Sequence, residues 1–270
     1  MSPINRNPLP LGMGSIKEID TVNSSYHIIA VKPDRELALF LFKKDKIDYI
    51  YNVCSMEGNP MTFPEVQTLL DGITVGGHKI EDEQQVLNQN KSVSLLLSML
   101  QNKEFKLDKE TFCKLNKIVS KDESIKPGEF RTSQVTISGT DYIPPKADKL
   151  DELFIKGVKK ISSIENPIIR SFVFFGFASR HQFFWDGNKR TSRLMANGVL
   201  LENGFQALNI KAKDSLEFNR ALIKFYNSCD YNVLLSYLIS YYEHSMRIFG
   251  TNDISRDYHN SQNTDRSMQY

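Results

Sequence analysis

The feature that most constrains the fold is an apolar stretch over residues 167–184, PIIRSFVFFGFASRHQFF. Apolar side chains would lie on nearly every face of a helix formed by this stretch, whereas a surface helix shows a single apolar stripe. The chain has 270 residues, of which 40% are apolar, so it can bury the core that such a helix requires. We therefore predict a central buried helix with the rest of the chain packed around it.

Helices are predicted on both sides of this stretch, so the fold class is mainly α. Apolar residues recur every three to four positions over 34–57, and shorter segments with helix caps follow the same rule. Residues 127–145 differ, because β-forming residues flank a Ser138–Gly139 turn and two prolines close the segment. We therefore predict a helical bundle that carries one short β-hairpin. The other predicted helices are 62–70, a long helix that ends near Leu100, 108–121, 146–164, 189–203, 214–228 and 231–249.

The composition excludes several classes of protein. Lys and Arg number 34 against 32 Asp and Glu, so the net charge of +2 makes no electrostatic case for nucleic-acid binding. Three dispersed cysteines without a CxxC pair favour a reducing compartment and argue against structural zinc. The N-terminus lacks the pattern of a secretory signal, and no apolar run reaches 18 residues. We therefore expect a protein that binds neither membranes nor nucleic acids and that is cytoplasmic, unless a secretion system that uses no cleaved signal exports it.

The stretch that follows the buried helix, DGNKRTSR at 186–193, has the residue types of an anion site. A helix that starts near Lys189 would point unbonded amides at a phosphate, and Gly187 would let the backbone approach closely. Asp186 could hold Mg²⁺ together with phosphates, and Arg190 and Arg193 would share one helix face. Each feature alone is also found in an ordinary turn, helix cap or solvated charge pair. Their combination in one short stretch predicts a triphosphate cradle.

The same stretch resembles a known family. FWDGNKRTSRLMANG is similar to the signature of the Fic (Fido) family, H-x-F-x-[DE]-G-N-[GK]-R-x-x-R, and other segments resemble Fic elements in the same order. SMEGNPMTFPEV resembles a glutamate-bearing inhibitory helix, PGEFRTSQVTISGTDYIPP a flap that holds the target backbone, and FYNSCDY a stretch that closes over adenine. The organisation implied is an N-terminal arm (1–33), N-terminal helices that include the inhibitory helix (34–125), a Fic core (126–250) and a disordered tail (251–270).

The resemblance implies a protein adenylyltransferase, which transfers AMP from ATP to a protein hydroxyl and releases pyrophosphate. ATP and Mg²⁺ are the implied cofactors, the implied partner is an unidentified target protein or the chain itself, and a homodimer is left open. By motif position, Asn188 and Arg190 are implied to act in the chemistry. The remaining implied roles are Mg²⁺ binding by Asp186, phosphate binding by Gly187, Asn188, Lys189, Arg190 and Arg193, anchoring of the loop by Phe184, and adenine contact by Asn227.

The chain departs from the signature at the catalytic base. The family histidine lies four residues before the acid, where this chain has Gln182, while His181 lies five before it. A glutamine amide cannot take up a proton near neutral pH, whereas a neutral imidazole can. Either Gln182 replaces the base, or a local bulge brings His181 into its place. The unbroken match from Phe184 to Arg193 favours Gln182, and activity is then expected to be weak or altered, because a base is worth about 10²–10⁴-fold.

A regulatory feature is implied by the sequence VCSMEGN, which contains Glu57 and Gly58. The family pattern is [ST]-x-x-x-E-[GN], and this chain has Val53 where Ser or Thr is usual. The resemblance implies that Glu57 pairs bidentately with Arg193 in place of the γ-phosphate and so holds the activity in check. Two alternatives to an inhibited transferase stay open: a catalytically silent ATP-binding regulatory protein, and a variant that removes AMP from modified proteins.

Overall fold

The structure is a computed structural model that describes residues 17–22 and 32–251. These residues are mainly helical, and no β-strand occurs among them. The 3-10 helices (η) and α-helices are, in chain order, η1 (Glu18–Thr21), α2 (Arg35–Lys44), α3 (Lys46–Met56), α4 (Phe63–Leu70), α5 (Ile80–Gln101), α6 (Lys109–Val119), η2 (Ala147–Lys149), α7 (Leu150–Ser162), α8 (Pro167–His181), α9 (Asn188–Glu202), η3 (Ala212–Asp214), α10 (Ser215–Ser228) and α11 (Tyr231–Thr251).

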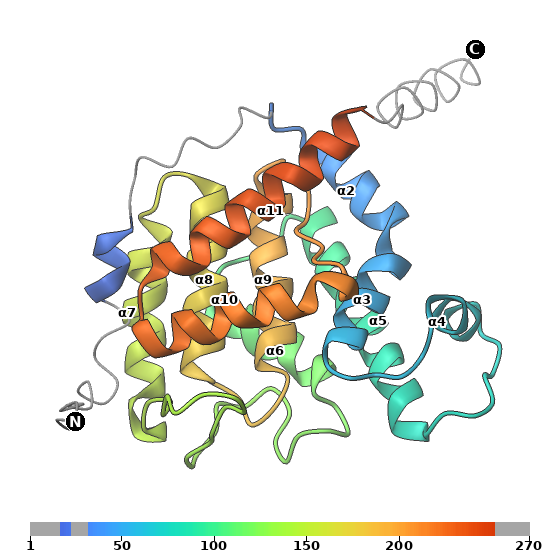
Figure 1. The fold of residues 1–270 in the computed structure, drawn as a ribbon, viewed down its shortest axis with the longest axis horizontal. Coiled ribbons are helices and arrows are strands. Elements are labelled where there is room, and N and C mark those ends of the chain that lie inside the picture. Colours follow the sequence, from blue (N-terminus) through green and yellow to red (C-terminus); the bar gives the residue numbers. More distant parts are fainter. Residues whose placement is uncertain (1–16, 23–31, 252–270) are drawn as a thin grey trace, which may run out of the picture.

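The central buried helix predicted from the sequence is α8. Its first turn is capped by Asn166, whose side chain accepts hydrogen bonds from the amides of Ile168 (2.9 Å) and Ile169 (3.2 Å). Every residue from Ser171 to His181 is buried. Among the described helices, α8 and α9 pack on each other most extensively, and α7, α10 and α11 also contact α8 (Figure 1). The loop that joins α8 to α9 therefore has both of its ends fixed in the core.

The helix predicted over 34–57 is interrupted, so that prediction is wrong in one respect. The helices α2 and α3 meet at Asp45, where the backbone leaves the helical conformation (φ −93°, ψ 13°). Aspartate favours helix ends over interiors, because its side chain competes for backbone hydrogen bonds. Buried residues such as Leu41 and Ile50 continue the apolar stripe on both sides of the break. For this reason the periodicity did not reveal it.

The β-hairpin predicted at 127–145 is also wrong: this segment, the flap loop, turns at Gly139 (φ 83°) but forms no strand. Its two arms are joined by the side chain of Arg131, which is buried and donates to the carbonyl of Pro145 (2.5 Å). Pro144 and Pro145 lack the amides that a strand ladder needs, and the Arg131 guanidinium takes a carbonyl that a ladder would use. The flap loop is therefore held by a side chain in place of backbone pairing.

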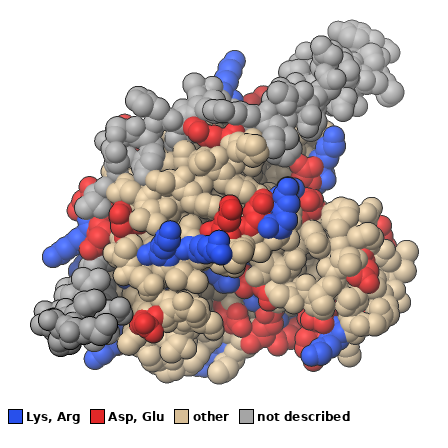
Figure 2. All heavy atoms as spheres, viewed as in Figure 1, with Lys and Arg blue, Asp and Glu red and all other residues tan. Residues whose placement is uncertain are grey.

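Parts of the predicted arm and tail lie outside the described residues. Within the predicted arm (1–33), η1 is described, and its Ile19 is buried and belongs to the core. The predicted tail beyond Thr251 lies outside the described residues. None of the described helices has the length and hydropathy that a membrane crossing requires. On the face drawn in Figure 2, basic and acidic side chains are interspersed.

Candidate active site

The loop between α8 and α9 carries the predicted cradle. Gly187 adopts the left-handed conformation (φ 72°), which suits glycine, and a Cβ there would lie only 3.0 Å from Val119 Cγ1. The helix α9 begins at Asn188, and no side chain caps its amides. Amides in the first turn of a helix have no intrahelical acceptor and carry a partial positive charge. The loop and the helix start therefore offer backbone amides that suit the predicted anion.

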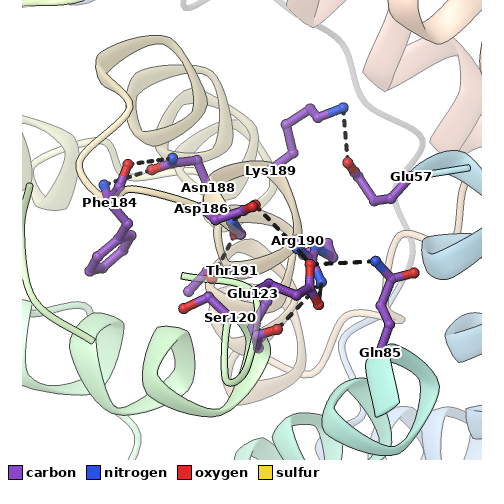
Figure 3. A network of polar contacts seen from close by, with 12 residues as sticks. Glu57, Gln85, Ser120, Glu123, Phe184, Asp186, Asn188, Lys189, Arg190 and Thr191 are labelled. Carbon is purple, nitrogen blue, oxygen red and sulfur yellow. Dashed lines mark hydrogen bonds and ion pairs between the residues drawn. The ribbon is translucent and has the colours of Figure 1, made fainter. Parts of the chain in front are cut away.

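The side chain of Asn188 holds the loop in shape. It is buried and forms two hydrogen bonds with the backbone of Phe184. Its side-chain oxygen accepts from the Phe184 amide (2.8 Å), and its side-chain nitrogen donates to the Phe184 carbonyl (2.8 Å; Figure 3). It also donates to Oε1 of Gln182 (3.0 Å). The Phe184 ring is buried and packs against Phe112, with 4.6 Å between the ring centroids. The side chain of Asn188 is thus engaged within the loop, and the phosphate contact predicted for this residue stays a prediction.

Two cations of the cradle are paired with Glu57, which follows the last residue of α3. Oε1 of Glu57 accepts from Nη2 of Arg193 (3.0 Å), and Oε2 pairs with Nζ of Lys189 (3.2 Å; Figure 3). The bidentate pair predicted between Glu57 and Arg193 is wrong in this detail, because Lys189 takes the second oxygen. Burial acts to raise the pKa of Glu57, but the charges of Lys189 and Arg193 outweigh it and hold this pKa below its usual value. An ionised carboxylate therefore lies against the side chains that were predicted to bind phosphate.

The third cation, Arg190, is held by a residue that the sequence reasoning missed. Its side chain is only 4% exposed and donates to both carboxylate oxygens of Glu123 (2.8 and 2.6 Å; Figure 3). Burial acts to lower the pKa of Arg190, but the hydrogen bonds and charge of Glu123 raise it above its usual range. Arg190 is therefore a buried, charged group with its own counterion. No local pattern marks Glu123, which lies 67 positions before Arg190 in the chain.

Gln182 and His181 lie in different surroundings. Gln182 follows α8 in the left-handed conformation (φ 51°) and accepts the hydrogen bond from Asn188. His181 is completely buried against the rings of Phe177 and Phe183, with centroid distances of 4.3 and 5.4 Å, and its Nδ1 lies 2.8 Å from the Phe177 carbonyl oxygen. Of these two residues, Gln182 is thus the one whose side chain is hydrogen-bonded to Asn188 of the cradle. This arrangement argues against a bulge that would bring His181 into the cradle.

The burial of His181 predicts how folding stability depends on pH. Desolvation lowers the pKa of His181 from 6.5 to about 3. Between these values the unfolded chain binds a proton that the folded chain does not, so the contribution of His181 is complete above pH 6.5 and is lost as the pH falls. Urea unfolding should show that the free energy of unfolding is lower at pH 5 than at pH 7 by about 2 kcal/mol from this group alone.

The control for this prediction is the variant His181→Leu, compared with the natural chain at both pH values. Leucine cannot titrate, so the variant should have lower stability at both values but a smaller loss between them, by about 2 kcal/mol. Equal losses in the two proteins would contradict the assignment of His181 as a neutral core residue.

Comparisons with known proteins bear on this site. A sequence model of the Fic/DOC family matches residues 106–200, a range that includes α6, the flap loop, α8 and the 186–193 cradle. The chain therefore contains a region, here called the Fic domain, that matches the model of the Fic/DOC family. Its Fic domain supplies Gln182 and every predicted phosphate-binding residue of the cradle, whereas Glu57 and Asn227 lie outside the matched range.

Curated relatives resemble more of the chain than the Fic domain. The protein adenylyltransferase Fic of Nematostella vectensis is 24% identical over 216 residues, which are 73% of this chain and 50% of that protein. The protein adenylyltransferase Fic of Drosophila ananassae is 25% identical over 197 residues, 70% of this chain and 39% of that protein. The chain therefore spans half or less of the length of these two relatives.

Solved structures share the fold. A Fic family protein from Desulfovibrio desulfuricans G20 superposes with a TM-score of 0.69 at 18% identity, covering 93% of this chain and 78% of that one. A Fic domain containing signaling protein from Bacteroides thetaiotaomicron VPI-5482 superposes with a TM-score of 0.65 at 20% identity, covering 86% and 92% of the two chains. The helical fold of the described residues is thus that of Fic proteins.

Asn227, the predicted adenine contact, faces the flap loop of the Fic domain. It is exposed near the end of α10, and Thr140 of the flap loop donates a hydrogen bond to its side-chain oxygen. Nearby, the guanidinium of Arg180 lies 3.8 Å from the ring centroid of Tyr142. The flap loop is therefore in contact with α8 and with α10. The role of Asn227 at adenine stays a prediction.

Asp186 is the candidate metal ligand of the Fic domain. Its side chain is 49% exposed; Oδ1 accepts from the Gly187 amide and contacts Arg190, while Oδ2 has no protein partner in the part of the chain that the structure describes. No group of three or more His, Cys, Asp or Glu side chains that could hold a metal occurs in the same part. Mg²⁺ is often bound by one or two carboxylates together with substrate phosphates. The residues present therefore fit a cation that arrives with a nucleotide.

Proposed function

We propose that this chain binds ATP with a divalent cation in the 186–193 cradle and transfers AMP to protein hydroxyl groups at a low rate. The observation that carries this proposal is the pairing of Lys189 and Arg193 with the carboxylate of Glu57 beside uncapped amides of α9. These groups bind one anion already, and a phosphate offers the same charge in the same place. The relatives named protein adenylyltransferase support AMP as the transferred group.

ATP would bind by replacing the carboxylate of Glu57. Phosphate oxygens would accept hydrogen bonds from the first amides of α9 and from the side chains of Lys189 and Arg193. Arg190 would contribute its charge from the buried pair with Glu123, because its guanidinium is already occupied there. Asp186 would hold the divalent cation, which when bound neutralises charge on the phosphates.

In the transfer, a target hydroxyl oxygen forms a bond to the α-phosphorus as the bond to the pyrophosphate oxygen breaks, and the electron pair leaves with pyrophosphate. The hydroxyl proton needs an acceptor. Gln182 cannot accept it at neutral pH and can only orient the hydroxyl by hydrogen bonds, so the proton passes to water. Transfer at phosphorus depends mainly on positioning and charge neutralisation. We therefore expect a reduced rate in place of complete loss.

Glu57 would act as an inhibitor built into the chain. While it occupies Lys189 and Arg193, the terminal phosphate of ATP cannot bind them, and the nucleotide cannot take the pose needed for transfer. The network on α3 supports a stable position for this residue: Asp48 accepts hydrogen bonds from Asn52 (3.1 Å) and from Asn209 (2.6 Å), which ties α3 to the segment before η3. Glu57 would therefore be released only when α3 moves or when ATP competes successfully.

A second candidate function is a catalytically silent protein that binds ATP as a regulatory signal. The observation in its favour is the amide of Gln182 in contact with Asn188, at the position where the family signature has a base. A third is the removal of AMP from modified proteins, in which Glu57 would direct a water. Both use the same cradle, but the silent protein forms no product, and the reverse activity releases AMP from a modified protein with water.

The proposal predicts that Arg193→Ala, in a chain that also carries Glu57→Gly, weakens ATP binding and lowers AMP transfer together. A hydrogen bond to a charged group is worth about 1.5–3 kcal/mol, so affinity should fall about tenfold to a hundredfold. Calorimetry with ATP and Mg²⁺ measures binding, and ATP labelled at the α-phosphate measures transfer. The matched control is Arg35→Ala, which removes a partly buried arginine paired with Glu202 at the other end of α9; it should change neither quantity.

The possible results separate the candidate functions. Slow labelling that depends on Arg193 supports the transferase. ATP binding without label, both in the natural chain and after Gln182→His, identifies the silent regulator. Release of AMP from a modified protein, without labelling, identifies the reverse activity. A chain that binds no ATP, with or without Glu57, contradicts the proposal.

A further inference from the structure

The C-terminal end of α6 lies against the loop of the cradle. Residues Asn116, Val119 and Ser120 surround Gly187 so closely that a Cβ on this glycine would lie 3.0 to 3.3 Å from their side chains. Glu123 follows in the turn after α6 and reaches the same region (Figure 3). We call these residues (Asn116, Val119, Ser120 and Glu123) the α6 platform. None of them belongs to the signature sequence.

Asn116 is the first of two polar contacts between the α6 platform and the loop. Its side chain is completely buried, and Nδ2 donates to the backbone carbonyl of Asp186 (3.0 Å) and to Oγ1 of Thr191 (3.1 Å). Its Oδ1 accepts from the amide of Gly128, at the start of the flap loop (3.0 Å). One side chain therefore fixes the backbone of Asp186 relative to both α9 and the flap loop.

Glu123 makes the second contact, through Arg190. Both oxygens of Glu123 bind the guanidinium, and Nη2 of the same guanidinium lies 3.3 Å from Oδ1 of Asp186. Arg190 has little freedom, because its side chain is 4% exposed and it also donates to the carbonyl of Val119 (3.3 Å). Glu123 thus places a positive charge beside one oxygen of Asp186. The other oxygen, Oδ2, is left for a ligand.

We propose that Asn116 and Glu123 are positioning residues for the divalent cation: Asn116 holds the backbone of Asp186, and Glu123 orients its carboxylate through Arg190. This inference rests on the proposed function, since it assumes that the cation arrives with ATP. Mg²⁺ demands near-ideal octahedral geometry, so a single carboxylate ligand must be held accurately. Residues that orient a metal ligand without touching the metal typically matter about 10- to 100-fold in metal affinity.

The test measures the factor by which Mg²⁺ tightens ATP binding, as the ratio of dissociation constants in EDTA and in saturating Mg²⁺. The full chain with Glu57→Gly is the parent, so that Glu57 does not compete with the nucleotide, and Asp186→Ala defines the loss of the metal ligand. Glu123→Gln and Asn116→Leu should each lower the factor about tenfold, towards the value for Asp186→Ala, and Asn116→Leu should leave binding in EDTA unchanged. Asn116→Leu changes no charge, so it separates positioning from a simple loss of negative charge.

Two substitutions on α9 that lie away from Asp186 control for general destabilisation. Glu202→Gln removes a carboxylate paired with an arginine, and Asn197→Leu removes a buried asparagine that is hydrogen-bonded to Leu208. Each should lower the thermal midpoint without changing the Mg²⁺ factor. If Asn116→Leu does not fold, as judged by thermal melting, Asn116→Ser replaces it.

The outcomes for the inference and for the proposed function are distinct. If the parent shows a Mg²⁺ factor that Asp186→Ala abolishes, but neither α6 variant lowers it more than the controls do, the positioning role is overturned while the proposed function stands. If the parent does not bind ATP, the proposed function fails and this inference with it. A factor that does not depend on Asp186 overturns the assignment of the metal ligand and therefore the positioning role.

Discussion

Replacing Gln182 by histidine is expected to raise the rate of AMP transfer by about 10²- to 10⁴-fold, the usual contribution of a general base. A neutral imidazole can accept the hydroxyl proton near pH 7, which the glutamine amide cannot. The backbone at this position is left-handed (φ 51°), a conformation in which histidine occurs more often than most residues. The new side chain would therefore start from the same position beside Asn188.

The measurement is the initial rate of labelling from ATP that carries the label on its α-phosphate, in chains that also carry Glu57→Gly. Gln182→Asn serves as the matched control, because it keeps an amide at this position and should give no gain. His181→Leu should not lower the rate of the Gln182→His chain, since His181 is buried in the aromatic core. If Gln182→His leaves the rate at its starting value, residue 182 does not occupy the base position.

Removing the carboxylate of Glu57 is expected to strengthen productive ATP binding by about tenfold to a hundredfold. The estimate follows from the loss of a competing charged contact of about 1.5–3 kcal/mol. In the variant Glu57→Gly, Lys189 and Arg193 lose the anion that now lies 3.2 and 3.0 Å from them, and a phosphate can take its place. The quantities to measure are the dissociation constant for ATP and the rate of labelling.

Glu57→Gln separates charge from shape in this experiment. The amide keeps the size of the side chain but not its negative charge, so it should give a smaller gain in the same direction. A rise in ATP affinity that appears only with Glu57→Gly would point to greater freedom at the end of α3. No change in affinity or rate with either variant would remove Glu57 from the proposed regulation.

The fold was predictable where each element has its own local signal. The stretch 167–181 has apolar residues on all faces, and this pattern can be satisfied only at the centre of a bundle, where α8 lies. The break at Asp45 was missed because the apolar stripe does not change across it. The flap loop was misread because its β-forming residues predict a strand, and because the contact of the Arg131 side chain with the Pro145 carbonyl is not visible in the sequence.

The candidate site was predictable only as far as one stretch of sequence contains it. The resemblance to the family signature led to Gln182 as the occupant of the base position, and in the structure Gln182 contacts Asn188. Glu123 and Asn116 could not be found in this way, because they lie 67 and 70 positions from the residues they bind. A buried arginine requires a counterion, but the sequence does not say which carboxylate supplies it.

The position of Gln182 also bears on how such a chain could arise. Histidine and glutamine codons differ only in their third base, so one nucleotide change converts either residue into the other. Hydrogen bonds of other residues also hold the loop around Gln182. Asn188 forms two with the backbone of Phe184, and Asn116 donates one to the carbonyl of Asp186. A lineage could therefore lose or regain the base in one mutational step, because the frame that binds the nucleotide does not have to be rebuilt.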